Sequence, residues 1–321
     1  MQITNNSGIS LTLAVWLVND DYDYINTPNY ISATRLMKPI RQIVLAKRVP
    51  PEMRQIDVED RIATALGTAL HDSIEKAWVK NYKGNLKQLG YPESVINRVL
   101  INPTDEELAA VKDPIPVYLE QRATRELNGY TIGGKFDIVA DGMVQDNKST
   151  SSYVWVHGGR DDEHQLQGSI YRWLNPKKIT EEFIRINYIF TDWQKMSAKQ
   201  NPKYPQKRIL YKDIPLMSLE ETERWVIAKI AQFQKYRKAP EEQLPECTDE
   251  ELWRSAPVFK YYSDPQNTSG KSTKNFDDMI EARKHVADKG KGIIIAVPGE
   301  VKRCGYCPAF PICKQREKYF Q

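Results

Sequence analysis

Residues 134–148 read GKFDIVADGMVQDNK and predict a β-hairpin that brings two carboxylates face to face. Apolar and polar residues alternate on both sides of Asp141-Gly142, a dipeptide that suits a two-residue type I′ turn. In that register Asp137 lies opposite Asp146, with Cβ atoms about 5 Å apart, where like charges destabilise a sheet. A divalent cation with a preference for oxygen ligands would bridge the two groups. The stretch therefore predicts a metal site.

A lysine completes this pattern. Period-two alternation puts Lys148 on the same face as Asp146 and across from Lys135. Magnesium or manganese would be held by Asp137 and Asp146, with the backbone carbonyl of Asn147 as a further ligand. Lys148 would position or deprotonate the attacking water and stabilise the negative charge of a transition state. Two acids and a lysine around one metal are typical of a site that cleaves phosphodiesters.

The pattern of acid, any residue, lysine has little specificity by itself. Glu300-Val301-Lys302 also meets it. The pattern becomes more specific because a second carboxylate lies at the position that the hairpin register requires. A solvated acidic hairpin at a sheet edge is the alternative reading of the same residues.

A histidine upstream is a candidate third ligand. Gly67, His71 and Glu75 recur at i, i+4 and therefore share one face of a predicted helix. The chain has only four histidines, and neutral imidazole is an ordinary ligand for manganese. The small residues around His71 permit close backbone packing. The alternative is a partly buried helix histidine with a hydrogen-bond partner.

Two polar residues follow the hairpin on another predicted helix. Gln167 and Tyr171 are also at i, i+4. The glutamine could orient the water or a phosphate, and the tyrosine ring could offer a surface for an unstacked base. Packing and capping are the alternative roles for both. Glu120 and Glu126, just before the hairpin, are further candidate ligands for metal or water.

Composition sets broad limits. The chain has 321 residues, 40% hydrophobic and 27% charged, as in ordinary globular proteins, and its net charge of +4 is too small to argue for nucleic acid. No apolar run reaches membrane-spanning length, so no membrane partner is expected. Residues 8–18 are apolar, but no basic segment precedes them and acidic residues follow. They predict a buried strand or helix start rather than an export signal, hence a cytoplasmic protein with reduced cysteines.

The order of predicted elements favours an α/β core. An N-terminal segment, residues 1–56, is expected to pack on a core at 57–238, and a turn-rich extension follows at 239–321. The core is expected to contain a helix at 57–82, a helical insertion at 83–115, strands at 116–156, a helix at 162–174, a strand at 184–191 and a helix at 218–238. Helix, then strands, then helix, then strand suggests a mixed sheet that begins with antiparallel strands.

A basic segment lies at 194–208. It holds five cations and no acid: Lys195, Lys199, Lys203, Lys207 and Arg208. Together with Lys135, these residues could follow a phosphate backbone. Pro202 and Pro205 are expected to exclude a regular helix there. A solvated loop is the alternative.

Four segments in this order resemble one known family. They are Gly67 to Glu75, Gly134 to Asp137, Asp146-Asn147-Lys148, and Gln167 to Tyr171. Together they resemble the PD-(D/E)XK nuclease superfamily and, within it, the RecB-like branch, which includes the AddB and CRISPR-adaptation nucleases. The overall sequence, including residues 248–253, is also similar to the sequences of RecB-like nucleases carried by bacteriophages. The motifs cover roughly residues 60–175.

The resemblance implies a fold and a site. The fold would be a restriction-endonuclease-like core, a mixed sheet flanked by helices, with a helical insertion and a cysteine-bearing C-terminal extension. His71, Asp137 and Asp146 would be metal ligands and Lys148 the catalytic lysine, with Gln167 and Tyr171 as the motif behind them.

The resemblance also implies an activity. The protein would be a magnesium- or manganese-dependent deoxyribonuclease, an exonuclease in replication, recombination or repair. Water would attack the phosphorus in line, with no covalent enzyme intermediate. DNA and a helicase or recombination protein would be its partners, in the host cytoplasm if a phage encodes it. Two alternatives are a catalytically silent DNA-binding or protein-interaction module and a structural zinc protein with an incidental hairpin.

The cysteines form a second candidate site. Cys304, Cys307 and Cys313 have a Cys-x2-Cys-x5-Cys spacing that resembles the iron–sulfur members of this branch. Those members carry a fourth cysteine before the catalytic core, where residues 36–40 of this chain have none. Cys247 is the remaining thiol and could be the fourth ligand, for a 4Fe–4S cluster or for a zinc ion.

Overall fold

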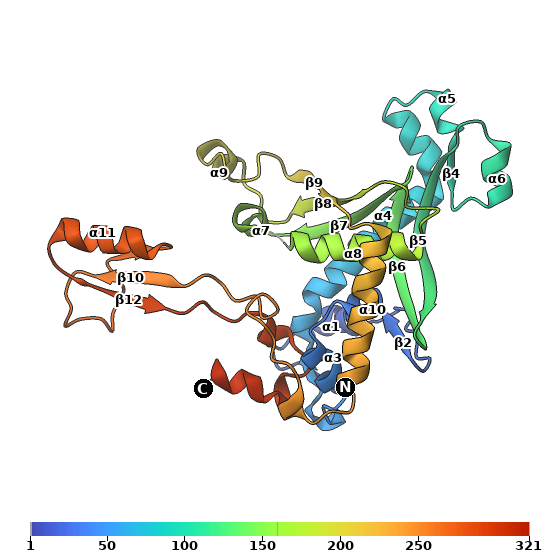
Figure 1. Ribbon diagram of the computed structural model, residues 1–321. Helices are drawn as coiled ribbons and strands as arrows, with labels where there is room; N and C mark the ends of the chain where they lie inside the picture. Colours follow the sequence, from blue (N-terminus) through green and yellow to red (C-terminus); the bar gives the residue numbers. More distant parts are fainter. Residues whose placement is uncertain (1, 159, 321) are drawn as a thin grey trace. The chain divides into compact units, whose positions relative to one another are not determined.

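The computed structural model describes residues 2–158 and 160–320, which fall into two compact units (Figure 1). The first comprises Met1–Met37 and Arg54–Gln234, and the second comprises Lys38–Met53 and Lys235–Gln321. The boundary near residue 235 lies close to the expected end of the core at 238. Residues 38–53 differ from the expectation of an N-terminal segment on the core. They belong to the second unit, where Arg41 donates hydrogen bonds to Glu241 and to the Leu244 carbonyl.

A seven-stranded mixed sheet forms the centre of the first unit. Its order is β4-β5-β6-β7-β8-β9, and β2 pairs with β6. The β5–β6, β6–β7 and β8–β9 pairs are antiparallel, while β4–β5, β7–β8 and β2–β6 are parallel. The strands are β2 Tyr30–Ser32, β4 Val99–Ile101, β5 Ile115–Leu127, β6 Tyr130–Ala140, β7 Met143–Thr150, β8 Phe183–Phe190 and β9 Ile209–Pro215. The mixed sheet is therefore confirmed, although its first strands in the chain, β2 and β4, form parallel pairs and the antiparallel run begins only at β5.

The hairpin of β6 and β7 has the expected register. Asp141 and Gly142 both have positive φ, 49° and 79°, as a type I′ turn requires. The ladder pairs Ala140 with Met143 and continues to Ile138 and Gln145, where it ends. The next positions outward are Asp137 and Asp146.

Beyond the ladder the two strands separate. Lys135 pairs with Arg122 of β5, and Lys148 pairs with Tyr188 of β8. The prediction that these lysines face each other across the hairpin was therefore wrong. The reason is that β7 pairs with β6 only from Met143 to Gln145 but with β8 from Val144 to Thr150. The β7–β8 pairing joins distant parts of the chain.

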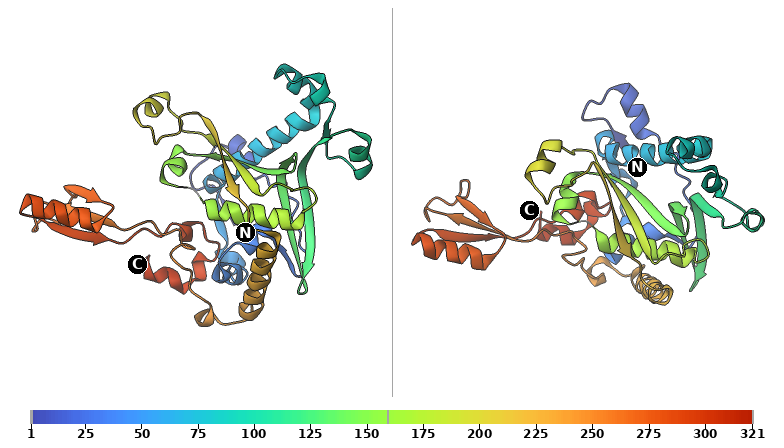
Figure 2. Two further views of the ribbon diagram at one scale, coloured as in Figure 1. Left: turned by 45° about the horizontal axis from the view of Figure 1, so that its top comes forward. Right: turned by 90° about the horizontal axis from the view of Figure 1, so that it is seen from above.

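Helices flank this sheet (Figures 1 and 2). Ile74 and Trp78 of α4 pack against a cluster that contains Leu119 and Ile138. Helix α8 approaches so closely that a Cβ on Gly134 of β6 would meet the side chains of Leu174 and Tyr171. The main helices are α4 Ile62–Gln88, α8 Asp161–Leu174 and α10 Leu219–Tyr236. Each corresponds to a predicted helix, although α4 extends further and has a break at Asn81.

The second unit contains a small sheet that the sequence did not predict. Its order is β11-β10-β12, all antiparallel, and helix α11 packs on it through Ala282 and Val286. The elements are α3 Ile40–Ala46, β10 Val258–Tyr262, β11 Lys274–Phe276, α11 Met279–Lys289 and β12 Ile293–Val297. These strands are short and separated by turn residues. For that reason the sequence predicted only a turn-rich segment here.

Three local predictions need correction. Helix α7, Ser152–His157, replaces the last part of the strands expected at 116–156, and strand β4 lies inside the insertion expected to be helical. A short helix, α9 Lys195–Gln200, forms in the basic segment because both prolines follow its end. Residues Leu11–Val18 form helix α1, but its apolar side chains are mostly exposed rather than buried, with Leu11 at 79%.

No helix among the described residues is long and apolar enough to span a membrane.

Two helical glycines offer a matched test of packing. A Cβ on Gly168 of α8 would lie 2.7 Å from Leu216 Cδ2 and 2.9 Å from Ile184 Cβ, whereas one on Gly67 of α4 would meet nothing within 4 Å. The close packing expected around Gly67 is therefore absent at that position. Gly168→Ala should lower the free energy of unfolding by about 1–3 kcal/mol because the core is overpacked. Gly67→Ala should raise it by about 0.5–1 kcal/mol. Urea unfolding of both variants measures the difference, and equal effects would contradict the packing.

Candidate metal centre

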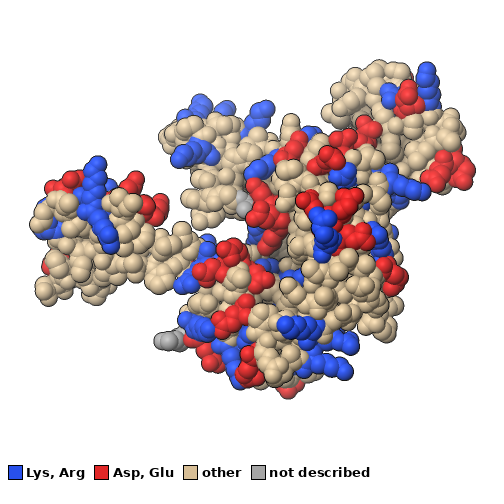
Figure 3. Space-filling view, in the orientation of Figure 1, with Lys and Arg blue, Asp and Glu red and all other residues tan. Residues whose placement is uncertain are grey.

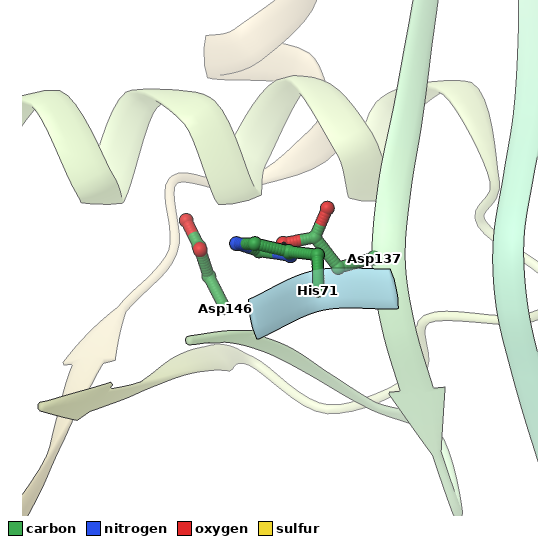
Figure 4. Close-up of side chains that lie close together, drawn as sticks. All are labelled: His71, Asp137 and Asp146. Atoms are coloured by element: carbon green, nitrogen blue, oxygen red, sulfur yellow. Dashed lines mark ion pairs between the residues drawn. The ribbon is translucent and has the colours of Figure 1, made fainter. Parts of the chain in front are cut away.

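Three predicted ligands converge in the first unit. His71 on α4, Asp137 on β6 and Asp146 on β7 each offer a ligand atom, and these atoms all lie within 4.8 Å of one another. Figure 4 shows the three side chains pointing toward one another. His71 Nδ1 lies 3.1 Å from Asp137 Oδ2. The arrangement has the donor set of a site for a divalent ion, one imidazole and two carboxylates.

Asp146 has an unusual environment. The residue is only 4% exposed, and its Oδ1 has no hydrogen-bond partner among the described residues. Its other oxygen, Oδ2, lies 2.7 Å from Lys148 Nζ. A buried carboxylate oxygen without a partner is costly, and a cation bound between Asp137 and Asp146 would remove that cost. The residues therefore fit a bound divalent cation.

A third carboxylate lies beside Asp137 on its other side. The β5–β6 ladder pairs Leu119 with Ile138 and Gln121 with Phe136, which places Glu120 at the level of Asp137. Glu120 interrupts the ladder there with a φ of 51°. Strands β5, β6 and β7 therefore carry three acids at one level of the sheet.

Glu120 contributes to the hollow beside this site. Its Oε2 lies 2.7 Å from Lys135 Nζ, and its pKa is raised, chiefly by burial. The hollow is lined by His71, Ile74, Glu75, Leu119, Glu120, Asp137, Ile138 and Asn147. Glu126, by contrast, is not among these lining residues and accepts a hydrogen bond from Thr131.

The helix α8 supplies the expected glutamine and tyrosine. Gln167 Nε2 donates to the Tyr171 hydroxyl over 3.0 Å. Burial, with the nearby Asp146 and Asp137 carboxylates, raises the pKa of Tyr171 well above its usual range. Since Tyr171 is only 7% exposed, its ring cannot serve as the base-stacking surface that the sequence suggested. Its hydroxyl instead lies near enough to Asp146 and Asp137 for their charges to act on it.

Two further polar residues were not anticipated. His164 lies one helical turn before Gln167 on α8, and burial lowers its pKa while Asp146 and Lys148 act on it electrostatically. Its i, i+3 spacing from Gln167 was a signal available in the sequence. Asn187 of β8 donates to Asn147 Oδ1 over 3.0 Å. This contact comes from the β7–β8 pairing, which local sequence does not indicate. Use of the Asn147 backbone carbonyl as a ligand stays a prediction.

We expect the stability of the protein in chelator to depend on pH through the protonation of His71. The hydrogen bond to Asp137 raises the pKa of His71, and burial opposes this. A raised folded-state pKa stabilises the protein fully below the unfolded value, about 6.5, and the benefit is lost as pH rises through the folded-state pKa. We expect the metal-free protein to exceed His71→Gln in stability by more at pH 6 than at pH 8, by on the order of 1 kcal/mol. Chemical unfolding in chelator at both pH values measures this, and a difference that grows with pH would contradict the ion pair.

The predicted basic segment and the four cysteines are not part of this group of side chains. The five cations of the basic segment are exposed on and after α9, and Figure 3 shows lysine and arginine gathered over this part of the chain. All four cysteines line a single hollow in the second unit.

Comparisons with known proteins give little further information. No family model and no curated protein matches the chain. A solved structure described as "Crystal structure of SSO0001" is similar over 72% of this chain and 89% of that chain, with 17% sequence identity and a TM-score of 0.42. This likeness is too weak to carry an argument about the fold or the activity.

Proposed function

We propose that this protein is a divalent-metal-dependent deoxyribonuclease of the RecB-like PD-(D/E)XK type. The observation that carries the proposal is the convergence of His71, Asp137 and Asp146, with an unpartnered buried oxygen on Asp146 and with Lys148 in contact with the same carboxylate. The donor set suits magnesium or manganese. Such an ion, when bound, would supply Lewis-acid polarisation of a phosphodiester and a lower pKa for water.

The chain's own residues would hold and orient the reactants. His71 and the two aspartates bind the ion, and the His71–Asp137 hydrogen bond fixes the imidazole. Lys148 is partly exposed and ion-paired to Asp146, so its ammonium can stabilise negative charge that develops on a phosphate. Gln167, which donates to the Tyr171 hydroxyl, would orient the water or a phosphate.

Purified protein and end-labelled DNA test the proposal. Linear and circular DNA are incubated with manganese, with magnesium and with chelator. We expect metal-dependent cleavage of linear DNA, and resistance of circular DNA would identify an exonuclease. Salt-sensitive DNA binding without any metal-stimulated cleavage would instead support the silent binding module. A helicase or recombination partner and a place in the host cytoplasm stay predictions.

The basic segment is proposed to bind the phosphate backbone of the substrate. Lys195, Lys199 and Lys203 are exposed, and residues 194–208 contain no acid. Changing these three lysines to glutamate should weaken DNA binding at low salt and reduce the slope of log affinity against log salt by about 2 for single strands. The rate of cleavage at saturating DNA should change little.

A matched variant controls for net charge. Lys271, Lys284 and Lys289 are equally exposed but lie in the second unit, on and near α11. Their triple change to glutamate should leave the salt slope nearly unaltered. Equal losses in the two triple variants would mean that only net charge matters and that the basic segment has no special role.

A further inference from the structure

Strand β12 forms one border of the small sheet in the second unit (Figure 1). Its residues, Ile293–Val297, read IIIAV and contain no charge and no proline. Among the described residues its backbone pairs only with β10, so alternate N–H and C=O groups on its other side have no partner in this chain. Proteins normally protect such an edge from pairing with another strand by lysines, prolines or a short strand.

The opposite border of the same sheet has that protection. Strand β11 has only three residues and begins with Lys274. The side chains of β12, by contrast, are apolar on both faces. Ile294 packs on the cluster beneath α11, while Ile293 on the other face is 41% exposed. The sheet therefore has one protected border and one apolar border without protection.

The direction of the backbone groups shows which residues of β12 could bond to a further strand. The Thr273 N–H, on the β11 side, donates to the Tyr261 carbonyl over 2.9 Å. Backbone groups alternate in direction along a strand, so those of Lys260 point to β12, where Lys260 pairs with Ile295. Ile295 therefore bonds to β10. The residues on either side of it direct their N–H and C=O groups to the free edge.

This edge is complementary to a second copy of itself. If two copies of β12 run antiparallel about Ile295, Ile294 of each copy lies opposite Ala296 of the other. Such a pair exchanges both of its hydrogen bonds, so the outward groups of these residues are all satisfied. Ile293 then lies opposite Val297, and Ile295 lies opposite its own copy. Apolar side chains therefore meet apolar side chains on both faces of the joined sheet.

The charges at the two ends of β12 favour the antiparallel arrangement. The nearest charged residue before the strand is Lys291, and the nearest after it is Glu300. Both are exposed, and neither forms an ion pair with another described residue. Antiparallel pairing brings the lysine end of one copy to the glutamate end of the other. Parallel pairing would bring like charges together, which is unfavourable.

We propose that β12 is an interface between two copies of this chain, paired antiparallel about a twofold axis at Ile295. The two small sheets then form one continuous sheet, and the symmetric contact closes after two copies. An interface made by one short strand is small, so the dimer forms in a concentration-dependent way. The proposal does not depend on nuclease activity.

Sedimentation equilibrium tests whether this edge pairs. The average mass of the wild-type protein should rise with concentration from that of one chain toward that of two. Ala296→Pro removes an outward N–H, a change that a free edge tolerates, and should keep the mass of one chain. Asn275→Pro removes the outward N–H of β11 and should associate like the wild type. A wild type that stays monomeric, or an Ala296→Pro variant that still dimerises, would overturn the proposal.

Cysteine cross-linking tests the register. Residues opposed in a non-hydrogen-bonded antiparallel pair have Cα atoms about 4.5 Å apart, within the range of a disulfide. Ile295→Cys should therefore link two copies in mild oxidant, well above the background given by the wild-type cysteines. Ile293→Cys, on the same face, lies opposite Val297 and should give only that background. Equal cross-linking by the two variants, or none by Ile295→Cys, would contradict the twofold axis at this residue.

A charge exchange tests the pairing of the strand ends. Lys291→Glu should weaken the dimer by roughly two- to thirtyfold, because the symmetric contact places two glutamates beside each introduced charge or its copy. The double variant Lys291→Glu with Glu300→Lys should recover most of the wild-type dissociation constant. Dimerisation that stays weak in the double variant would contradict the antiparallel arrangement.

Discussion

Asp146→Asn is expected to reduce manganese-dependent DNA cleavage by at least about 10³-fold, equivalent to about 4 kcal/mol of transition-state stabilisation. The amide keeps the shape of the side chain but removes the charge that the ion would neutralise. Asp146 is one of the three residues whose ligand atoms converge, so the substitution would remove one charged ligand of the proposed centre. Initial rates on end-labelled linear DNA, at a manganese concentration that saturates the parent protein, measure the effect.

A surface aspartate gives the matched control. Asp213 is paired with Arg185 at 2.7 Å on β8 and β9 and takes no part in the centre. Asp213→Asn should cleave DNA at nearly the parent rate. DNA affinity in chelator should be similar in both variants. Cleavage by Asp146→Asn at the parent rate would show that the assignment of this carboxylate is wrong.

Lys148→Met is expected to lower the turnover rate by about 10²- to 10³-fold while leaving manganese binding intact. The ammonium of Lys148 contacts Asp146 Oδ2, so its removal deletes a positive charge beside the proposed metal site but no proposed metal ligand. With that competitor for the carboxylate gone, manganese should bind at least as tightly. Single-turnover cleavage combined with manganese calorimetry separates the two effects.

The control for this variant is another paired lysine. Lys212 is exposed and forms an ion pair with Asp161, and Lys212→Met should affect neither quantity. Lys148→Arg keeps the charge in a larger group and should recover part of the rate. A Lys148→Met variant that loses manganese binding as well would indicate that the lysine holds the carboxylates together rather than acting on the phosphate.

Local sequence was enough to predict the hairpin and the helices around it. Asp141-Gly142 can adopt two positive φ values in succession, and this turn fixes the register that places Asp137 and Asp146 next to each other. The i, i+4 spacing of Gln167 and Tyr171 likewise predicted that they share one helix face, and the structure places them in hydrogen-bond contact on α8. These features depend on residues close together in the chain, so short-range chemistry decides them.

Features that depend on distant residues could not be predicted. Lys135 and Lys148 do not face each other because β7 pairs with β6 only near the turn and then continues along β8. The β7–β8 pairing forms across the α7–α8 connection. Glu120 has an unusual backbone conformation and forms an ion pair with a lysine on the next strand. Arg41 donates to Cys313 Sγ but lies far from the cysteines in the sequence, and no motif relates it to them. In each case the partner is chosen by tertiary packing, which overrides local preference.

Manganese calorimetry tests the central claim most directly. Wild-type protein, with and without DNA, should bind manganese at a site that Asp146→Asn and Asp137→Asn each abolish and that Asp213→Asn leaves intact. Binding should also raise the melting temperature of the wild type in proportion to occupancy. If the wild type takes up no manganese even with DNA present, or if the two site variants bind it as tightly as the wild type, no cation joins these carboxylates and the proposed nuclease centre does not exist.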